Sequence, residues 1–246
     1  MVSNKRPIWV LCDVYDAAAY WAAEQLQDAG HEVSVATAAQ LDAAVRLQHR
    51  IARSGRCSVE IELADGRCLS DKDGAGILNR LSAVSAERLQ AIAGAERDYA
   101  LQEMHALFLS WLHALPGKML NRPTTQGLGG NWRHPSAWAL LAGQAGLESA
   151  PYRQSECIDP GADWGLVPHP DATTVYCVDG CLATTCELPS LPAEACLALG
   201  ALAGDALIGI DLLNDQDRWI FHSASPRPDL CKGGRPVIDA ISKAFS

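Results

Sequence analysis

Residues 7–37 read PIWVLCDVYDAAAYWAAEQLQDAGHEVSVAT. This stretch begins and ends with a short apolar run, and each run is typical of a buried strand. Between the two runs, Asp16 fits a helix N-cap and Gly30 fits the residue at which a helix ends. A strand–helix–strand order favours two parallel strands joined by a crossover helix. The stretch therefore predicts an α/β fold with a parallel sheet.

The turn after the first predicted strand contains no glycine. Dinucleotide-binding folds of the Rossmann type place a glycine-rich turn there, because the backbone must approach a pyrophosphate closely. The sequence thus argues against a Rossmann nucleotide site in the N-terminal part of the chain.

Charge and hydropathy exclude several functional classes. The 246 residues carry 29 acidic and 20 basic side chains, which gives a formal net charge of −9. Nucleic-acid-binding proteins normally have the opposite balance or a dense basic patch, so we expect no nucleic-acid partner. No apolar run is long enough for a transmembrane helix, and the first one is too short for a signal peptide. We expect a cytoplasmic protein without a membrane contact.

Turn signals in the remaining sequence predict hairpins. Asp65-Gly66 and Asp179-Gly180 each lie between alternating stretches, and residues 214–217 form a third such turn. Residues 85–115 repeat apolar side chains at three- and four-residue spacing, as a long helix does. We expect hairpins to extend the parallel sheet in the N-terminal part and to form a small α+β unit in the C-terminal part.

The prolines indicate how the chain divides into domains. Residues 148–172 contain four prolines and follow no regular pattern, which predicts a linker. We therefore expect an N-terminal α/β domain over residues 1–147 and a C-terminal α+β unit over residues 173–246.

Nine cysteines without an export signal indicate free thiols in a reducing compartment. Cys177, Cys181 and Cys186 lie closest together, but their spacing is not that of a zinc site. We expect them to pack as small apolar side chains. The alternative is a metal- or thiol-dependent enzyme that uses these three cysteines together with His222.

Basic and aromatic side chains gather near predicted strand ends and in the glycine-rich loop of residues 124–135. Open α/β sheets bind ligands at strand ends, and arginine suits carboxylate or phosphate groups. The candidate ligand-binding residues are Arg80, Asn121, Arg122, Trp132, Arg133 and His134. The alternative for the charged ones is a solvent-facing position. Candidates for the wall of a peptide groove, or else for packing, are Trp132, Trp138, Trp164 and Trp219.

Asp211 and His222 are the candidate metal ligands, because carboxylate and imidazole both suit transition metals. Two ligands do not complete a site, so the alternative for His222 is a strand position on a half-exposed face.

Four stretches, taken in order, resemble an ATP-grasp protein of the carboxylate–amine ligase type, a group that includes enzymes that modify peptides. They are the glycine-free N-terminal unit; Asn79-Arg80 and Asn121-Arg122-Pro123, on either side of the long helix; Ala145-Gly146-Leu147 followed by Pro151; and Gly209–Leu212 with Trp219–Phe221 and Ser225–Pro228. The last stretch is similar to the closing metal-site hairpin of the family. The resemblance implies an ATP-grasp-like α/β fold.

The sequence departs from this family where the nucleotide and metal would bind. ATP-grasp ligases form an acyl phosphate that an amine then attacks, which requires cations against the triphosphate and carboxylates for magnesium. The family's central subdomain supplies two lysines, whereas here the span from Pro151 to Thr174 is too short for that subdomain. No lysine lies between residues 119 and 231. Asp211 stands at the place of one metal ligand, but residues 221–225 (FHSAS) replace the family's Glu-x-Asn.

The resemblance and its departures together imply a shortened, degenerate ATP-grasp protein that lacks the central nucleotide-binding subdomain. We expect a non-catalytic binding or accessory subunit that recognises a peptide or a partner enzyme in peptide or natural-product modification. It would need no cofactor, and it would form a homodimer or a heterocomplex. The alternative is a compact carboxylate–amine ligase that uses ATP and Mg²⁺, with Arg80, Arg122, Arg133 and Asp211 in its site.

Overall fold

Contacts divide the chain into two compact units. The computed structural model describes residues 7–92, 94–149, 170–216 and 218–246. The first unit runs up to Gly130 and also includes Ser242–Ser246, and the second spans Asn131–Ile241. The expected boundary at residue 147 falls inside the second unit, and most of the expected linker, residues 148–172, lies outside the described residues.

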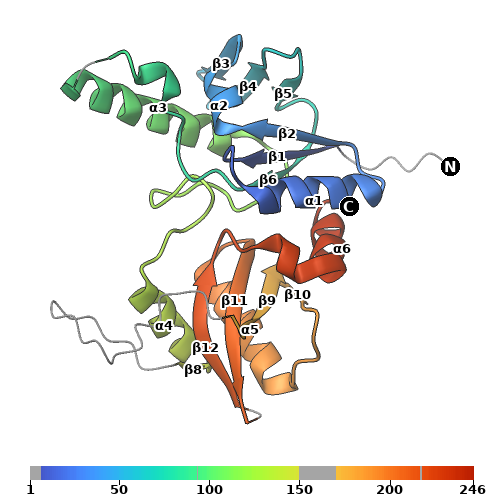
Figure 1. The fold of residues 1–246 in the computed structure, drawn as a ribbon. Helices are drawn as coiled ribbons and strands as arrows, with labels where there is room; N and C mark the ends of the chain where they lie inside the picture. Colours follow the sequence, from blue (N-terminus) through green and yellow to red (C-terminus); the bar gives the residue numbers. More distant parts are fainter. Residues whose placement is uncertain (1–6, 93, 150–169, 217) are drawn as a thin grey trace. The chain divides into compact units, whose positions relative to one another are not determined.

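A parallel sheet forms the centre of the first unit, in the order β2-β1-β6-β7 (Figure 1). Its strands are β1 (Ile8–Cys12), β2 (Val33–Thr37), β6 (Gly76–Asn79) and β7 (Met119–Leu120), and each pairs parallel to its neighbour. Helix α1 (Ala17–Asp28) connects β1 to β2, and the Asp16 side chain accepts a hydrogen bond from the Ala19 N–H at its start. The predicted strand–helix–strand unit is therefore confirmed, together with its N-cap.

A second, antiparallel sheet in the first unit has the order β3-β4-β5. Its strands are β3 (Arg46–Ile51), β4 (Cys57–Glu62) and β5 (Cys68–Ser70), and the short helix α2 (Ala38–Asp42) precedes them. The hairpin predicted at Asp65-Gly66 is present as β4–β5. The prediction that hairpins extend the parallel sheet is wrong, because β4 pairs with β3 and β5 and the three strands form a sheet of their own.

Helix α3 (Gly94–Ala114) packs against this second sheet and completes the core of the first unit. Phe108 and Trp111 contact each other edge to face, with ring centroids 5.4 Å apart, and both are buried. The helix is shorter than the predicted span 85–115. Gly94 has a φ of +49°, which L-residues avoid in a helix, and a separate 3₁₀ turn covers Glu87–Leu89.

The second unit is built on a five-stranded sheet of order β10-β9-β11-β12-β8 (Figure 1). Its strands are β8 (Glu148–Ser149), β9 (Thr173–Val178), β10 (Cys181–Ala183), β11 (Leu207–Asp215) and β12 (Arg218–Ser225). Helices α4 (Pro135–Gln144) and α5 (Ser190–Ala203) share one core with the apolar face of this sheet. Gly204 ends α5 in the left-handed conformation, with a φ of +70°. The hairpin predicted at Asp179-Gly180 is confirmed.

The last helix, α6 (Gly234–Ala244), follows a 3₁₀ turn over Leu230–Gly233. The residues after Ile241 belong to the first unit. There the Phe245 ring packs on Gly76, where an added Cβ would lie 2.5 Å from the ring, and Ser242 Oγ lies 2.5 Å from His31 Nε2. None of the described helices is both long and apolar enough to cross a membrane.

Candidate functional site

Asp211 lies in the middle of the second unit's sheet, with a hydroxyl on each side. Its Oδ1 accepts a hydrogen bond of 2.7 Å from Thr174 Oγ1 on β9, and its Oδ2 accepts one of 2.6 Å from Ser223 Oγ on β12. The three residues are directly opposite one another across the strands, so their side chains share one face of the sheet. Both carboxylate oxygens are therefore already hydrogen-bonded.

A β-bulge beside Asp211 decides which side chain of β12 stands opposite the acid. The register of β11 and β12 shifts between Asp211–Ser223 and Leu212–Phe221, so His222 is the extra residue of the bulge. Bulges of this kind redirect side chains locally. Ser223, not His222, consequently takes the position opposite Asp211.

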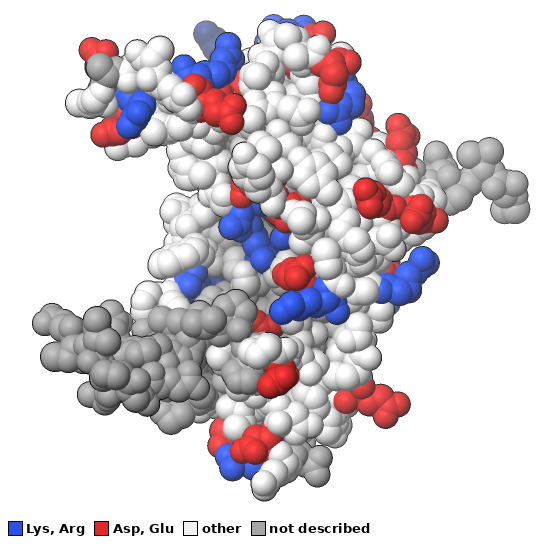
Figure 2. Space-filling view, viewed as in Figure 1, with Lys and Arg blue, Asp and Glu red and all other residues white. Residues whose placement is uncertain are grey.

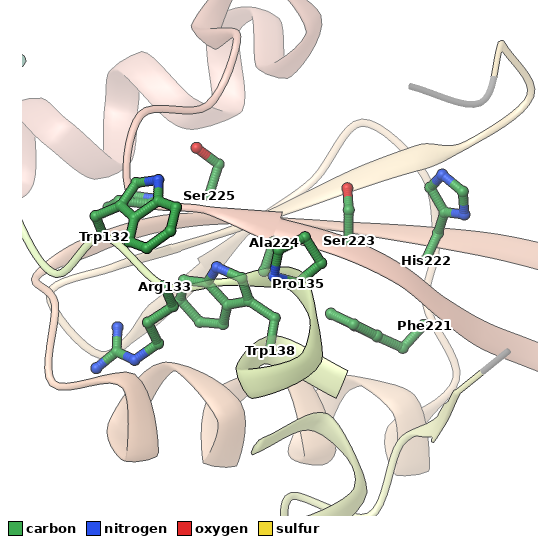
Figure 3. Close-up of a pocket in the computed structure, with 10 residues that line it drawn as sticks. Trp132, Arg133, Pro135, Trp138, Phe221, His222, Ser223, Ala224 and Ser225 are labelled. Carbon is green, nitrogen blue, oxygen red and sulfur yellow. The ribbon is translucent and has the colours of Figure 1, made fainter. Parts of the chain in front are cut away.

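A cavity of about 350 Å³ lies beside β12 and the beginning of α4 (Figure 3). It is lined by Trp132, Arg133, Pro135, Trp138, Phe221, His222, Ser223, Ala224, Ser225 and Pro226. Aromatic rings, prolines and hydroxyls predominate in this lining. Ser223 lines the cavity and donates to Asp211, but Asp211 itself is not part of the lining, and Figure 3 shows the Ser223 hydroxyl pointing away from the Trp138 and Phe221 rings.

Arg133 is fixed in the wall of this cavity by an ion pair and a ring. Its guanidinium donates to Asp205 Oδ2 at 3.0 Å and to the Ala203 carbonyl at 2.5 Å. The same group lies 4.9 Å from the centroid of the Trp138 ring, and Figure 3 shows the two side chains next to each other. The side chain of Asp205 is only 2% exposed. The positive charge of Arg133 is thus balanced by a buried acid.

The arrangement of strands and helices is shared with solved ATP-grasp structures. The macrocyclase MdnC from Microcystis aeruginosa MRC, bound with precursor peptide MdnA, is 14% identical, with a TM-score of 0.68 over 96% of this chain and 98% of MdnC. The ATP-grasp ligase PsnB, complexed with a phosphomimetic variant of minimal precursor, Mg and ADP, is 14% identical, with a TM-score of 0.67 over 98% and 99%. The chain has an ATP-grasp fold.

A third structure with this ATP-grasp fold is the RiPP-associated ligase from Chryseobacterium gregarium, in complex with ADP and a leader and core peptide. It is 11% identical, with a TM-score of 0.67 over 97% of this chain and 96% of the ligase. No protein-family model matches the sequence, and no curated protein is significantly similar to it. The similarity is therefore one of fold, as the sequence resemblance predicted.

Three of the predicted ligand-binding residues lie in the first unit and have structural partners there. The Arg80 guanidinium contacts both carboxylate oxygens of Asp16, at 2.8 and 3.1 Å, and Arg80 is 3% exposed. Asn121 is 1% exposed, and its carbonyl accepts a hydrogen bond from the Asn79 side chain. Arg122 donates to the carbonyls of Leu115 and Gly117. Ligand binding by these residues remains a prediction, and a ligand would compete with the contacts described.

The other three predicted residues lie in the second unit, at the beginning of α4. Trp132 and Arg133 line the cavity, and Trp132 is 64% exposed. His134 is the N-cap of α4, where its Nδ1 accepts a hydrogen bond from the Ser136 N–H. Of the tryptophans considered for a peptide groove, Trp138 also lines the cavity, whereas Trp164 lies outside the described residues.

Sequence reasoning missed Thr174 as a partner of Asp211, and it missed Phe221 and Ser223 as part of the cavity wall. Alternation along β12 alone places Ser223 on one face, but whether that face is the one with Asp211 depends on the bulge. The sequence gives no local signal for that bulge. The sequence feature that could have indicated a hydroxyl partner for Asp211 was the pair of serines, Ser223 and Ser225, in the return strand of the hairpin.

The described residues contain no group of three or more His, Cys, Asp or Glu side chains that could hold a metal ion. Of the three neighbouring cysteines, Cys177 is buried and its thiol donates to the Cys196 carbonyl at 3.1 Å, while Cys181 is exposed. Burial raises the pKa of the Cys177 thiol to about 12. Since metals and electrophiles react with the thiolate, this cysteine is poorly suited to either chemistry at neutral pH.

Proposed function

We propose that this protein is a non-catalytic binding or accessory subunit with an ATP-grasp fold that recognises a peptide. One observation carries the proposal. Asp211, the acid of the closing hairpin, stands between two hydroxyls, where an ATP-grasp ligase would need a second acid.

The surroundings of Asp211 favour the non-catalytic interpretation. Magnesium that carries a nucleotide is usually held by carboxylates together with phosphate oxygens and water. Here the groups that contact the acid are the hydroxyls of Thr174 and Ser223, which are neutral and donate hydrogen bonds to it. A single carboxylate offers Mg²⁺ one negative charge, and binding would cost the loss of these two hydrogen bonds.

The basic side chains of the second unit give further support. A triphosphate requires several unengaged cations in its binding site. Three described arginines of this unit already face an acid: Arg133 faces Asp205, Arg218 faces Glu148 and Arg235 faces Asp239. Arg227 and Lys232 are the other basic side chains in the described part of this unit, so three of its five cations are already balanced by an acid.

Recognition of a peptide is supported by the chemistry of the cavity and by the proteins that share the fold. A volume of about 350 Å³ with an apolar, aromatic wall suits a large apolar side chain. Trp132 at the rim is mostly exposed, and tryptophan contributes heavily to the energy of protein interfaces. MdnC was solved with precursor peptide MdnA, PsnB with a variant of minimal precursor, and the C. gregarium ligase with a leader and core peptide. We place the peptide side chain in this cavity.

Calorimetric titration with ATP and Mg²⁺ tests the non-catalytic part of the proposal. We expect no saturable heat up to about 1 mM nucleotide, a concentration that corresponds to about 4 kcal/mol of binding free energy. An active ligase with the same fold serves as the positive control. Tight, magnesium-dependent binding would overturn the proposal and favour the compact ligase, with Asp211 as its metal ligand.

Selection from a displayed library of random peptides tests the recognition part. Peptides enriched on the wild-type protein should bind the Trp132→Ala variant at least about tenfold more weakly, because the variant removes an exposed anchor at the cavity rim. Leu140→Ala is the matched control, since Leu140 is also 64% exposed and follows in α4 without lining the cavity. Equal binding to the wild type and Trp132→Ala would contradict the proposed site.

A further inference from the structure

Basic side chains gather at one end of the small antiparallel sheet of the first unit. Arg50 is near the end of β3, Arg56 precedes β4, and Lys72 follows β5. Together with Ile51, Ala52, Cys57, Ser58 and Asp71 they line a surface hollow of about 680 Å³. We call this hollow the basic groove. It contains three cations and one acid.

The acids of the same sheet do not neutralise the basic groove. At the far end, Arg46 stands opposite Glu62 and makes ion pairs with Glu60 and Glu62. At the groove end, the residue opposite Arg50 is Ser58. Within the part of the chain that the structure describes, Arg56 and Lys72 form no ion pair. The sheet therefore has an excess of one negative charge at the Arg46 end and an excess of positive charge at the groove end.

The single acid in the groove is engaged by the backbone. Asp71 Oδ1 accepts a hydrogen bond of 2.8 Å from the Val59 N–H, which fixes the turn between β5 and β6 against β4. The groove keeps an excess of about two positive charges in a chain whose formal net charge is −9. In Figure 2, acidic and basic side chains are interspersed on the visible face, so an excess of one sign is a local feature.

We propose that the basic groove binds an acidic segment of a peptide. Guanidinium groups pair with carboxylates through two parallel hydrogen bonds. Arg50 and Arg56 bring two such groups to one hollow, although the Arg50 Nε and Nη2 also donate to the side-chain oxygen of Gln48. Ile51, between them on the rim, is 66% exposed and offers an apolar contact to a neighbouring peptide side chain. The proposal rests on the proposed function to the extent that it specifies which peptides this protein recognises.

Two features favour a peptide over a nucleic acid. None of the described residues that line the groove is aromatic, so these residues offer unpaired bases no surface on which to stack. The net charge of −9 repels a long polyanion, whereas a short acidic segment needs only the local excess of positive charge.

Fluorescence anisotropy with a labelled ten-residue peptide of alternating Glu and Leu tests the groove. We expect saturable binding at 50 mM NaCl that weakens several-fold at 500 mM, because exposed charges are screened by salt. The triple variant Arg50→Glu, Arg56→Glu, Lys72→Glu should bind at least about tenfold more weakly. A peptide of alternating Gln and Leu should not bind.

Arg97→Glu is the matched control, because Arg97 is exposed on α3 of the same unit and outside the groove. It changes the net charge by the same amount per residue and should alter binding less than twofold. Circular dichroism of each variant confirms folding. Equal binding by the triple variant and the wild type overturns the proposal, as does tighter binding of a single-stranded oligonucleotide than of the Glu–Leu peptide.

The two proposals fail in different experiments. Trp132→Ala should leave binding of the Glu–Leu peptide unchanged, since Trp132 lines the cavity of the second unit and not the groove. If the Glu–Leu peptide does not bind while library-selected peptides still depend on Trp132, the proposed binding of acidic segments by the groove is overturned and the proposed peptide site in the cavity stands. If the Glu–Leu peptide binds through the groove while library-selected peptides do not depend on Trp132, the proposed cavity site is overturned and the groove proposal stands.

Discussion

Asp16 shows which contacts of a single residue can be predicted from its sequence neighbours and which cannot. The sequence placed Asp16 correctly as a helix N-cap, because that signal depends on the next three residues only. It did not predict that the same carboxylate pairs with Arg80, 64 positions later. The side chains are 4% and 12% exposed, so the pair is largely withdrawn from water.

Replacing Asp16 by alanine should lower the free energy of unfolding by about 3–5 kcal/mol, because it leaves a buried guanidinium without its acid and removes a helix cap. Urea denaturation followed by circular dichroism measures this loss. Arg235→Ala is the control: its ion pair with Asp239 is exposed, and the change should stay within about 0.5 kcal/mol. A loss below 1 kcal/mol for Asp16→Ala would show that the buried pair is not formed.

Among the elements, those with local signals were predictable. Asp-Gly turns identified the β4–β5 and β9–β10 hairpins. Strand β3 (RLQHRI) was missed, since most of its side chains are polar and only its pairing with β4 makes it a strand. The bulge at Asp211 was missed for the same reason, because it is a property of two strands together.

The close packing of β11 against the chain segment before α6 gives a prediction for this element. A Cβ added at Gly209 would lie 2.4 Å from Pro228 Cβ and 3.3 Å from Thr174 Cγ2. Because the proline ring cannot move aside, Gly209→Ala should destabilise the protein by about 2 kcal/mol or more. Gly143→Ala in α4 meets nothing within 4 Å and should instead stabilise by about 0.5–1 kcal/mol. Thermal unfolding of both variants checks the opposite signs.

For the whole molecule, the ATP-grasp fold was predictable because its motifs follow one another in sequence. The candidate site was only partly predictable. Trp132 and Arg133 were recognised from composition, but the cavity also needs β12, which lies some ninety positions later. Segments that far apart come together through the packing of the whole sheet, and no local pattern encodes that.

Buried thiols make the stability of the whole molecule dependent on pH. Burial raises the pKa of Cys12, Cys177 and Cys196 from 9.0 to about 12 in each case. The folded state holds these protons more tightly than the unfolded chain. Their contribution to stability is therefore complete below pH 9 and is lost as the pH rises toward 12.

The urea midpoint should accordingly be constant from pH 7 to 8.5 and fall between pH 9 and 11. Cys177→Ala, measured over the same range, should show a shallower fall, because one of the raised pKa values has been removed. A midpoint that stays constant up to pH 11 in the wild-type protein would contradict the burial of these thiols.

The return of Ser242–Ser246 to the first unit has a consequence for synthesis on the ribosome. Phe245 covers Gly76, but it is translated only after the whole of the second unit, Asn131–Ile241. At the usual ~5–20 residues per second, that delay lasts roughly 5 to 20 seconds. During this interval the surface over β6 in the nascent first unit is uncovered.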